Sequence, residues 1–460
     1  MKKIALVSLL AASTGLLTGC QTTLDEKPVT TKIVPPVRWT PSETPVSTQG
    51  VQMNWVSSFG DPQLRRLVDE AIENNLDLKI ADARLESARQ LTRIVRSEQL
   101  PGFSLGVNST YSETNGAFFD AFREDRYSLT LGTSWEADLW GKIRNSSASQ
   151  LAEEQATAYD LEQARQSIAA NACFLWFELI GAKQQLELAE ETLVSYQSTA
   201  DLIQNRYESG IDSALEYRLA LANLEAARSS VFQRKEALKQ AQRNLQILLG
   251  RYPDASLVAL TDFPIVHSSV PAGIPSDLLN RRPDIRAAER RLVSAELSIK
   301  SASKERLPNI QLTGATGTQT TEFKNLMDGN FDFWNLEATL SQPLFTGGRL
   351  DAQHQNAIAL YKQSLASYEL TALRAFMEVE QALDADYYLE HLEEALKNSA
   401  EQSSKAEDLA WDQYTSGIID IVTVLESQRR ALIAKQSYID AKKLRLNNRV
   451  QLHLSLGGDF

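Results

Sequence analysis

Apolar residues along this chain change period from helical to strand-like and back, and the change occurs twice. A helical pattern over about 61–98 ends near Pro101, because proline cannot continue a helix interior. Two segments, 103–115 and 126–138, alternate apolar and polar residues, a period typical of transmembrane β-strands. A long pattern rich in Ala, Glu, Gln and Leu follows over 145–249 and breaks once, at Gly210. The predicted unit is therefore a helix, a strand pair and a long helical hairpin.

The same unit returns later in the chain at a nearly constant offset, which indicates an internal duplication. The second copy predicts a helix over 283–305, strands within 309–344 and a hairpin over 350–456. The matching landmarks are Glu98-Gln99-Leu100-Pro101 with Glu305-Arg306-Leu307-Pro308, Leu139–Arg144 with Leu344–Arg349 (with slight slippage), Tyr207–Ile211 with Tyr414–Ile418, and Leu245–Gly250 with Leu452–Gly457.

The two hairpins are predicted to be coiled coils of unusual length. No proline occurs from Asn145 to Glu208, and an unbroken helix of that length would reach about 96 Å. Apolar residues spaced by seven form the seam of each return helix. They are Leu224, Val231, Leu238 and Leu245 in the first copy and Leu425, Leu432, Ile439 and Leu446 in the second.

The N-terminus predicts export and lipidation. Lys2 and Lys3 precede a short apolar run that is typical of a secretory signal. Leu17-Thr18-Gly19-Cys20 resembles a bacterial lipobox, in which the cysteine is acylated; the alternative is an ordinary signal peptide with an incidental cysteine. The predicted layout is a lipoprotein signal peptide at 1–19, an extended N-terminal segment at 20–60, a first repeat at 61–250, a linker or equatorial segment at 251–282, and a second repeat at 283–460.

Charge and hydropathy narrow the class of protein. The formal net charge is −12, and removing residues 1–19, with two lysines and no acids, leaves −14. This acidity argues against nucleic acid as a partner. After residue 19 no apolar stretch reaches the roughly 20 residues of a transmembrane helix, so any membrane crossing must use β-strands.

Four amphipathic strands per chain also predict an oligomer. In lipid an unpaired strand edge is costly, so only closed barrels are stable. Two chains would supply eight strands and three would supply twelve, and the residues alone leave this number open. Helical seams rich in alanine, flanked by polar residues, favour a ring of hairpins around a wet lumen.

Enzyme chemistry is not indicated. The four histidines (His267, His354, His391 and His453) lack metal-ligand spacing, and no phosphate-binding glycine loop or nucleophile elbow occurs. We therefore expect no catalytic residues, no metal, and no cofactor beyond the covalent lipid on Cys20.

Several motifs together resemble the outer-membrane efflux factors. They are Leu-Leu-Asn-Arg-Arg-Pro-Asp-Ile at 278–285, Leu-Pro-Asn-Ile-Gln-Leu at 307–312 and Pro-Leu-Phe-Thr-Gly-Gly-Arg at 343–349. The chain is most similar to the lipoprotein branch of the OprM and NodT type, with TolC a more distant relative.

This resemblance implies an α+β membrane protein with a duplicated unit. The family forms a homotrimer in which a twelve-stranded outer-membrane β-barrel is continuous with a long periplasmic α-helical barrel. Its partners are outer-membrane lipid, a periplasmic adaptor and an inner-membrane pump. The implied function is a passive exit duct that expels drugs and toxic compounds from the periplasm. The alternatives are a protein-secretion duct and a periplasmic adaptor lipoprotein, which would have one hairpin instead of two.

The resemblance also implies a periplasmic gate. Counted from Gly417, the matching positions are Val422, Glu426 and Arg429, which share one helical face. The alternative is that Glu426 and Arg429 are an ordinary surface ion pair and Val422 part of the seam. In the first copy the counterparts are uncharged: Leu215, Leu219 and Ala222. Gly210 and Gly417 mark the hairpin turns, where the resemblance implies contact with the adaptor.

Overall fold

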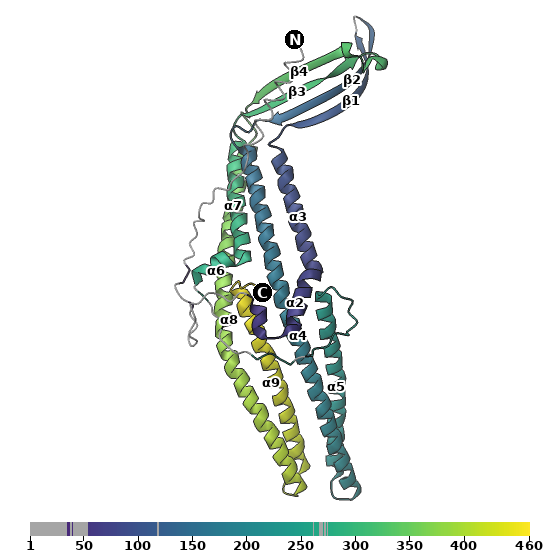
Figure 1. The fold of residues 1–460 in the computed structure, drawn as a ribbon, viewed down its shortest axis with the longest axis vertical. Helices are drawn as coiled ribbons and strands as arrows, with labels where there is room; N and C mark the ends of the chain where they lie inside the picture. Colours follow the sequence, from purple (N-terminus) through teal and green to yellow (C-terminus); the bar gives the residue numbers. More distant parts are fainter. Residues whose placement is uncertain are drawn as a thin grey trace. The chain divides into compact units, whose positions relative to one another are not determined.

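Long helices and one sheet account for almost all of the regular structure (Figure 1). The computed structural model describes residues 35, 36, 39, 54–116, 119–260, 262–265, 270, 273 and 275–460. Cys20 and the predicted signal peptide lie outside the described residues. The described residues divide into two compact units, one built from 84–158 and 287–369 and the other from the described parts of 33–83, 159–286 and 370–460.

The duplication is repeated in the helices almost residue for residue. In the first copy, α4 (Lys142–Glu208) and α5 (Ala214–Leu248) form the hairpin. In the second, α8 (Arg349–Thr415) and α9 (Ile421–Ser455) begin and end at the equivalent positions. Both long helices have 67 residues and both return helices have 35. The two copies therefore share one local fold, not only a few motifs.

The helix predicted over 61–98 is broken, and this prediction was wrong. Asn75 separates α2 (Pro62–Asn74) from α3 (Leu76–Ser97). Its backbone is extended, with φ −59° and ψ 132°, and its side-chain oxygen accepts from the N–H of Leu78 at 3.1 Å. Asparagine is a preferred residue for such a cap, so Asn75 ends one helix and begins the next.

The second copy contains the same break, inside a segment predicted to be a linker. α6 (Pro275–Arg281) and α7 (Pro283–Lys304) are separated by Arg282, which stands at the position equivalent to Asn75. The predicted linker 251–282 therefore includes a helix, α6, that belongs to the second repeat. Proline at the first position of α7 is compatible with the break, because that position needs no intrahelical N–H bond.

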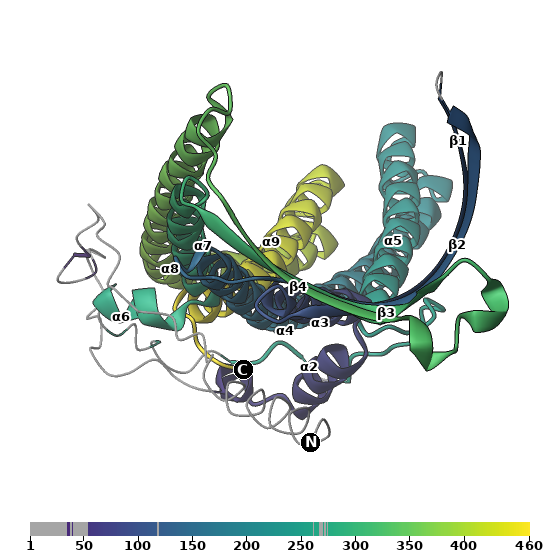
Figure 2. The ribbon, with the colours of Figure 1, turned by 90° about the horizontal axis from the view of Figure 1, so that it is seen from above.

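Four antiparallel strands form one sheet in the order β1-β2-β3-β4. They are β1 (Gly102–Gly116), β2 (Phe119–Glu136), β3 (Asn309–Thr320) and β4 (Asp332–Ser341), and Figure 2 shows their common curvature. β2 begins earlier than the predicted start at 126. Polar residues there still pair with β1, as in the 3.0 Å ion pair between Arg123 and Glu113. Between β3 and β4 lie two 3-10 turns, Phe323–Asn325 and Gly329–Phe331.

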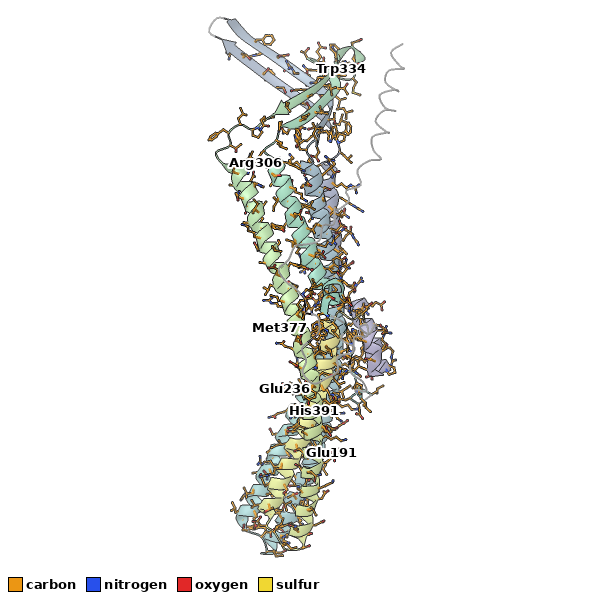
Figure 3. All side chains as sticks on the ribbon, turned by 90° about the vertical axis from the view of Figure 1, so that its left-hand side faces the viewer. Glu191, Glu236, Arg306, Trp334, Met377 and His391 are labelled. Atoms are coloured by element: carbon orange, nitrogen blue, oxygen red, sulfur yellow. The ribbon has the colours of Figure 1, made fainter. Side chains whose placement is uncertain are left out.

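The sheet has one apolar and one polar face. Residues directly opposite each other share a face, and Leu105 pairs with Leu131 while Thr316 pairs with Trp334. Leu105 is 72% exposed and Trp334, labelled in Figure 3, is 77% exposed. The exposed apolar residues of this face are Phe103, Leu105, Val107, Tyr111, Leu131, Trp334, Leu336 and Leu340. The intervening positions on β1, β2 and β4 are mostly Ser, Thr, Asn, Gly and Glu, so the predicted period-two pattern is confirmed.

The unit that holds the hairpins has its main core where α2, α4, α5 and α9 meet. Trp176 is fully buried there and donates its indole N–H to Asp61 at 2.8 Å. Trp55 stacks on His453 at 5.5 Å between ring centroids. Cys173 is buried in the same core, where it packs as a small apolar side chain. Among the described helices, none combines the length and the apolar character that a membrane span requires.

Candidate functional site

Each hairpin reverses through a short turn whose geometry requires glycine. Gly210 has φ +74° and Gly417 has φ +75°, values that other residues rarely adopt. Beyond each glycine the next N–H bonds back to the helix: Ile211 to the carbonyl of Arg206 and Ile418 to that of Gln413, both at 2.9 Å. This is the glycine-terminated helix end that satisfies the last carbonyls. The predicted turn role of both glycines is confirmed.

The return helices begin with side-chain caps. Ser213 and Glu216 form a reciprocal capping box at the start of α5. At the start of α9, Asp420 accepts from the Thr423 N–H at 3.0 Å and from its hydroxyl at 2.8 Å. These two hydrogen bonds lower the pKa of Asp420. Both turns are therefore closely defined, which fixes where the first residues of α9 stand.

Val422, Glu426 and Arg429, hereafter the gate trio, lie together on the first turns of α9. Val422 is 46% exposed, and the side chains of Glu426 and Arg429 are 40% and 58% exposed. The guanidinium of Arg429 makes two hydrogen bonds of 2.9 Å, one to each carboxylate oxygen of Glu426. The predicted common helical face is confirmed, and the exposed Glu426–Arg429 pair is also what the alternative of a surface ion pair predicts.

Arg430 is a partner of Glu426 that the sequence analysis missed. Its Nε lies 2.7 Å from a carboxylate oxygen of Glu426, four residues earlier on the same helix. Hydrogen bonds from Arg430 and then Arg429 lower the pKa of Glu426. Helical i,i+4 spacing was the available signal. Each Glu426 is therefore compensated by two cations of its own chain.

A second missed cluster joins the two hairpin tips. Arg206 bonds both oxygens of Asp212 at 3.0 Å. Tyr414 on α8 donates its hydroxyl to Asp212 at 3.0 Å, and Arg206 lies 5.1 Å from the centre of the Tyr414 ring. The Asp212 side chain is only 7% exposed and Tyr414 5%. We call Arg206, Asp212 and Tyr414 the tip lock.

The surroundings of Tyr414 in the tip lock favour its protonated, neutral form. Burial, followed by the hydrogen bond to and charge of Asp212, raises the pKa of Tyr414 to about 12. The sequence carried only a weak signal for this cluster. Asp212 is an acid, whereas the equivalent residue of the second copy is Ile419. Only the packing of the two hairpins brings Asp212 to Tyr414, which is 202 residues away.

Behind the gate trio, all four hairpin helices share a small core. Its members are Tyr196, Ala200, Ile203, Ala220, Leu224, Ala227, Ala410, Tyr414, Ile421, Val424 and Leu425. Gln428 is 3% exposed and donates to the hydroxyls of Ser195 at 3.0 Å and Thr199 at 3.2 Å. One face of α9 therefore packs on α4 while the opposite face carries the gate trio.

The ties between the hairpin tips are well suited to a reversible movement. Gln428–Ser195 is a neutral hydrogen bond, of the kind that contributes about 0.5–1.5 kcal/mol net, and Tyr414–Asp212 has a charged acceptor, for which the contribution is about 1.5–3 kcal/mol. A few such bonds hold one arrangement and can be broken together. Within the described part of the chain, no group of three or more His, Cys, Asp or Glu is placed to hold a metal.

Taken together, the duplicated hairpins, the two-faced sheet and the jointed tips define a channel-forming membrane protein of the efflux type. The chain belongs to the outer membrane efflux protein family, whose sequence model matches residues 67–251 and 274–458. The two matched segments are related by the same offset as the two repeats, in agreement with the duplication. The second begins at 274, so it includes α6.

Relatives in the family are similar over nearly the whole chain. The toluene efflux pump outer membrane protein TtgF of Pseudomonas putida is 31% identical over 421 residues, covering 90% of this chain and 87% of that protein. The outer membrane protein OprJ of Pseudomonas aeruginosa is 32% identical over 414 residues, covering 89% and 86%. This chain is accordingly an outer-membrane efflux channel, and the alternative of a periplasmic adaptor is wrong.

Solved channels share the fold. The outer-membrane channel OprN superposes with a TM-score of 0.86 at 28% identity, covering 95% of this chain and 99% of that one. The open state of the Neisseria gonorrhoeae MtrE outer membrane channel gives a TM-score of 0.82 at 26% identity, covering 95% and 98%.

Proposed function

We propose that this chain is the passive exit duct of a tripartite efflux system. Three copies form a tunnel that carries small molecules from the periplasm to the exterior and closes at the hairpin tips. The proposal rests on the combination of two features. The sheet has one apolar and one polar face, and the hairpin tips carry ion pairs and are linked to each other by hydrogen bonds. The duct needs no catalytic chemistry of its own, because the energy for transport comes from an inner-membrane pump.

The sheet supports assembly from several copies. Among the described strands, β1 pairs only with β2 and β4 only with β3, so each chain has two open edges. Open edges are not tolerated in lipid, so β1 of one copy pairs with β4 of the next. Three copies close twelve strands, with the apolar face of Leu105 and Trp334 toward lipid and the polar face toward the lumen.

The tips support a gate made from the second hairpin. In the trimer three copies of the gate trio meet near the axis, where Glu426 carboxylates repel unless cations compensate them. Arg429 and Arg430 of the same chain supply that compensation. Opening then breaks the tip lock and lets α8 and α9 move away from α4. A related channel, that of Neisseria gonorrhoeae, has been solved in an open state.

Small, largely apolar compounds are the proposed cargo. Relatives are named for the efflux of toluene, solvents and antibiotics, which favours such compounds over secreted proteins. A polar lumen face permits their passage without holding them, because a duct works best when its cargo binds weakly.

Two further attachments complete the proposal. Cys20 carries acyl chains, and several chains on one cysteine give stable anchoring because each buried methylene adds about 0.8 kcal/mol. The adaptor grips the hairpin turns around Gly210 and Gly417. The exposed Ile211 (64%) and Ile418 (71%) beside these glycines offer it apolar contact.

Conductance in planar bilayers tests the proposal. Purified acylated protein is compared with a variant carrying Glu426→Ala and Arg429→Ala. We expect wild type to be nearly closed and the double variant to conduct strongly, since the long side chains that narrow the proposed ring are lost. Equal small currents from both would exclude the gate trio as the gate, whereas no insertion under any condition would contradict the duct. Loss of lipid from a Cys20→Ser variant, read by mass spectrometry, tests the anchor separately.

A further inference from the structure

Arg282, in the Arg-Arg-Pro-Asp segment between α6 and α7, is buried at a junction of three helices. The residue is 6% exposed. Its guanidinium binds both oxygens of Asp284 at 3.0 and 2.7 Å and one oxygen of Glu378 on α8 at 2.7 Å. It also donates to the backbone carbonyl of Ser455, the last residue of α9, at 3.1 Å. We call these four residues the Arg282 clasp.

The clasp joins the gate-bearing hairpin at the end remote from its tip. Asp284 lies in the first turn of α7, Glu378 on α8 and Ser455 at the end of α9. Met377, labelled in Figure 3, is the neighbour of Glu378 and marks this level on α8. Gly457, with φ +68°, packs so closely that an added Cβ would lie 3.3 Å from Arg282. The end of the chain is therefore folded over the guanidinium.

The first repeat has a version of the same joint without the arginine, although Asp77 matches Asp284. Asn75 occupies the position of Arg282, and its amide donates to the carbonyl of Leu248, the last residue of α5, at 2.9 Å. The position of Glu378 is Asn171 in the first repeat. One neutral hydrogen bond thus caps α5, whereas four charge-assisted bonds join Arg282 to the second repeat: two to α7, one to α8 and one to α9. The hairpin without charged gate counterparts also lacks the charged clasp.

The contacts of Arg282 are expected to be stronger than the single hydrogen bond of Asn75, for the following physical reasons. The guanidinium fork matches a carboxylate in two parallel bonds, and a cation is favoured at a helix C-terminus. Burial by itself would lower the pKa of Arg282, but Asp284 and Glu378 outweigh that and raise it, so the cation is retained. Bonds of 2.7 to 3.1 Å to α8 and α9 cannot survive a slip of one residue, about 1.5 Å along a helix.

Because α9 is long, a small change of its direction at Arg282 produces a large displacement at the gate trio. Ile421 and Ser455 are the first and last residues of α9, and a helix of that length spans about 51 Å. A change of roughly 5° at one end of such a rod moves the other end by roughly 4 Å. That displacement exceeds the length of any hydrogen bond in the tip lock.

We propose that Arg282 is a positioning residue for the gate: it fixes the register and direction of α8 and α9, so that the gate trio meets at the tip. The inference rests on the proposed function for the location of the gate. Arg282 touches no cargo and acts only through the two helices it joins.

The test compares Arg282→Gln, Arg282→Lys and a matched control, Arg251→Gln. Arg251 lies in the same unit and forms a two-pronged pair with Glu70 without touching α8 or α9. We expect Arg282→Gln to raise closed-state conductance in planar bilayers about tenfold, as when a bistable gate loses roughly one charge-assisted bond. Arg282→Lys, which keeps the charge without the fork, should give a smaller rise, and Arg251→Gln none.

A second measurement distinguishes a loss of positioning from a loss of stability. It also does not depend on which residues form the gate. Spin labels at the exposed Gln204 and Gln413 report the spacing of the two tips, and buried Cys173 does not compete for the label. A broader distance distribution in Arg282→Gln supports the inference even if the Glu426→Ala and Arg429→Ala variant leaves conductance unchanged. A lower melting temperature with unchanged conductance and unchanged distances would overturn it.

If Arg282→Gln fails to fold, Glu378→Ala tests the same inference. This variant removes the acceptor on α8 and leaves Asp284 and Ser455 bound to the guanidinium. Broader tip distances in the folded protein are expected, and distances identical to wild type would contradict a positioning role.

Discussion

Tyr414 on α8 donates a hydrogen bond of 3.0 Å to Asp212, in the turn between α4 and α5, so the second hairpin is tied to the tip of the first. Both side chains are nearly buried, and Arg206 holds Asp212 from the other side. A hydrogen bond to a buried, charged acceptor is a strong tie, yet it can be broken without disrupting either helix. If the tips open as proposed, this is a place where the two hairpins part.

Replacing Tyr414 by phenylalanine should loosen the tip. The change removes one hydroxyl and leaves Asp212 bound to Arg206, so we expect a cost of about 1.5–3 kcal/mol to the closed arrangement. Open events in single-channel recordings should become more frequent. Tyr217→Phe is the control, because Tyr217 stacks on Tyr207 at the same tip, where its ring is the contact. Equal opening rates in Tyr414→Phe and wild type would show that the tie does not hold the tip closed.

Acid should open the channel through Glu426. Ion pairing with Arg430 and Arg429 holds the pKa of Glu426 below its usual value, so the contribution of these pairs is present at neutral pH and is lost as pH falls through the acid range. Conductance measured from pH 7 downward should rise at the acid end in wild type. In Glu426→Gln it should be raised already at pH 7 and change little with pH. A wild-type current independent of pH would contradict the role of Glu426.

The two faces of the sheet should respond differently to charge. Leu131 lies on the apolar face of β2, and its neighbour Thr130 lies on the polar face. Leu131→Arg should destabilise the membrane-inserted protein by about 2–4 kcal/mol near the bilayer midplane, while Thr130→Arg should cost far less. Urea titration of the refolded protein in liposomes measures both. Similar losses for the two variants would contradict the assignment of one face to lipid and the other to the lumen.

Protonation of His453 should destabilise the folded unit in acid. Burial, with a smaller effect from Arg449, lowers the pKa of His453 to about 4. Below pH 6.5 the unfolded chain therefore binds more protons than the folded one, and the free energy of unfolding falls until about pH 4, by about 1.4 kcal/mol per pH unit at most. Thermal unfolding of His453→Gln should depend less on pH than that of wild type. His391→Gln, at an exposed site, is the matched control for the loss of a histidine side chain.

Local pattern was sufficient for the repeating architecture. Proline at 101 and 308, period-two alternation in the strands and seams spaced by seven are all properties of neighbouring residues, and they predicted the strand pairs and hairpins. The same applies to Gly210 and Gly417, since a reversal between two helices demands a residue that tolerates positive φ. The gate trio could be placed on one face of α9 because a helix relates residues three and four apart.

Other features depended on contacts that no local pattern records. Asn75 and Arg282 each separate two helices. Only the tertiary structure shows that their side chains also bind the ends of α5 and α9. The early start of β2 follows from pairing with β1, which stabilises a polar stretch that would not form a strand alone.

By itself, then, the sequence determined the duplicated series of helices and strands, the hairpin turns and the amphipathic faces, because these arise from steric and hydrophobic preferences of adjacent residues. The tertiary structure decided which distant side chains meet. Asp212 with Tyr414, and Arg282 with Glu378 and Ser455, are joined by packing between helices far apart in the chain. Such pairings depend on the burial and register of whole helices, so no short segment contains enough information to specify them.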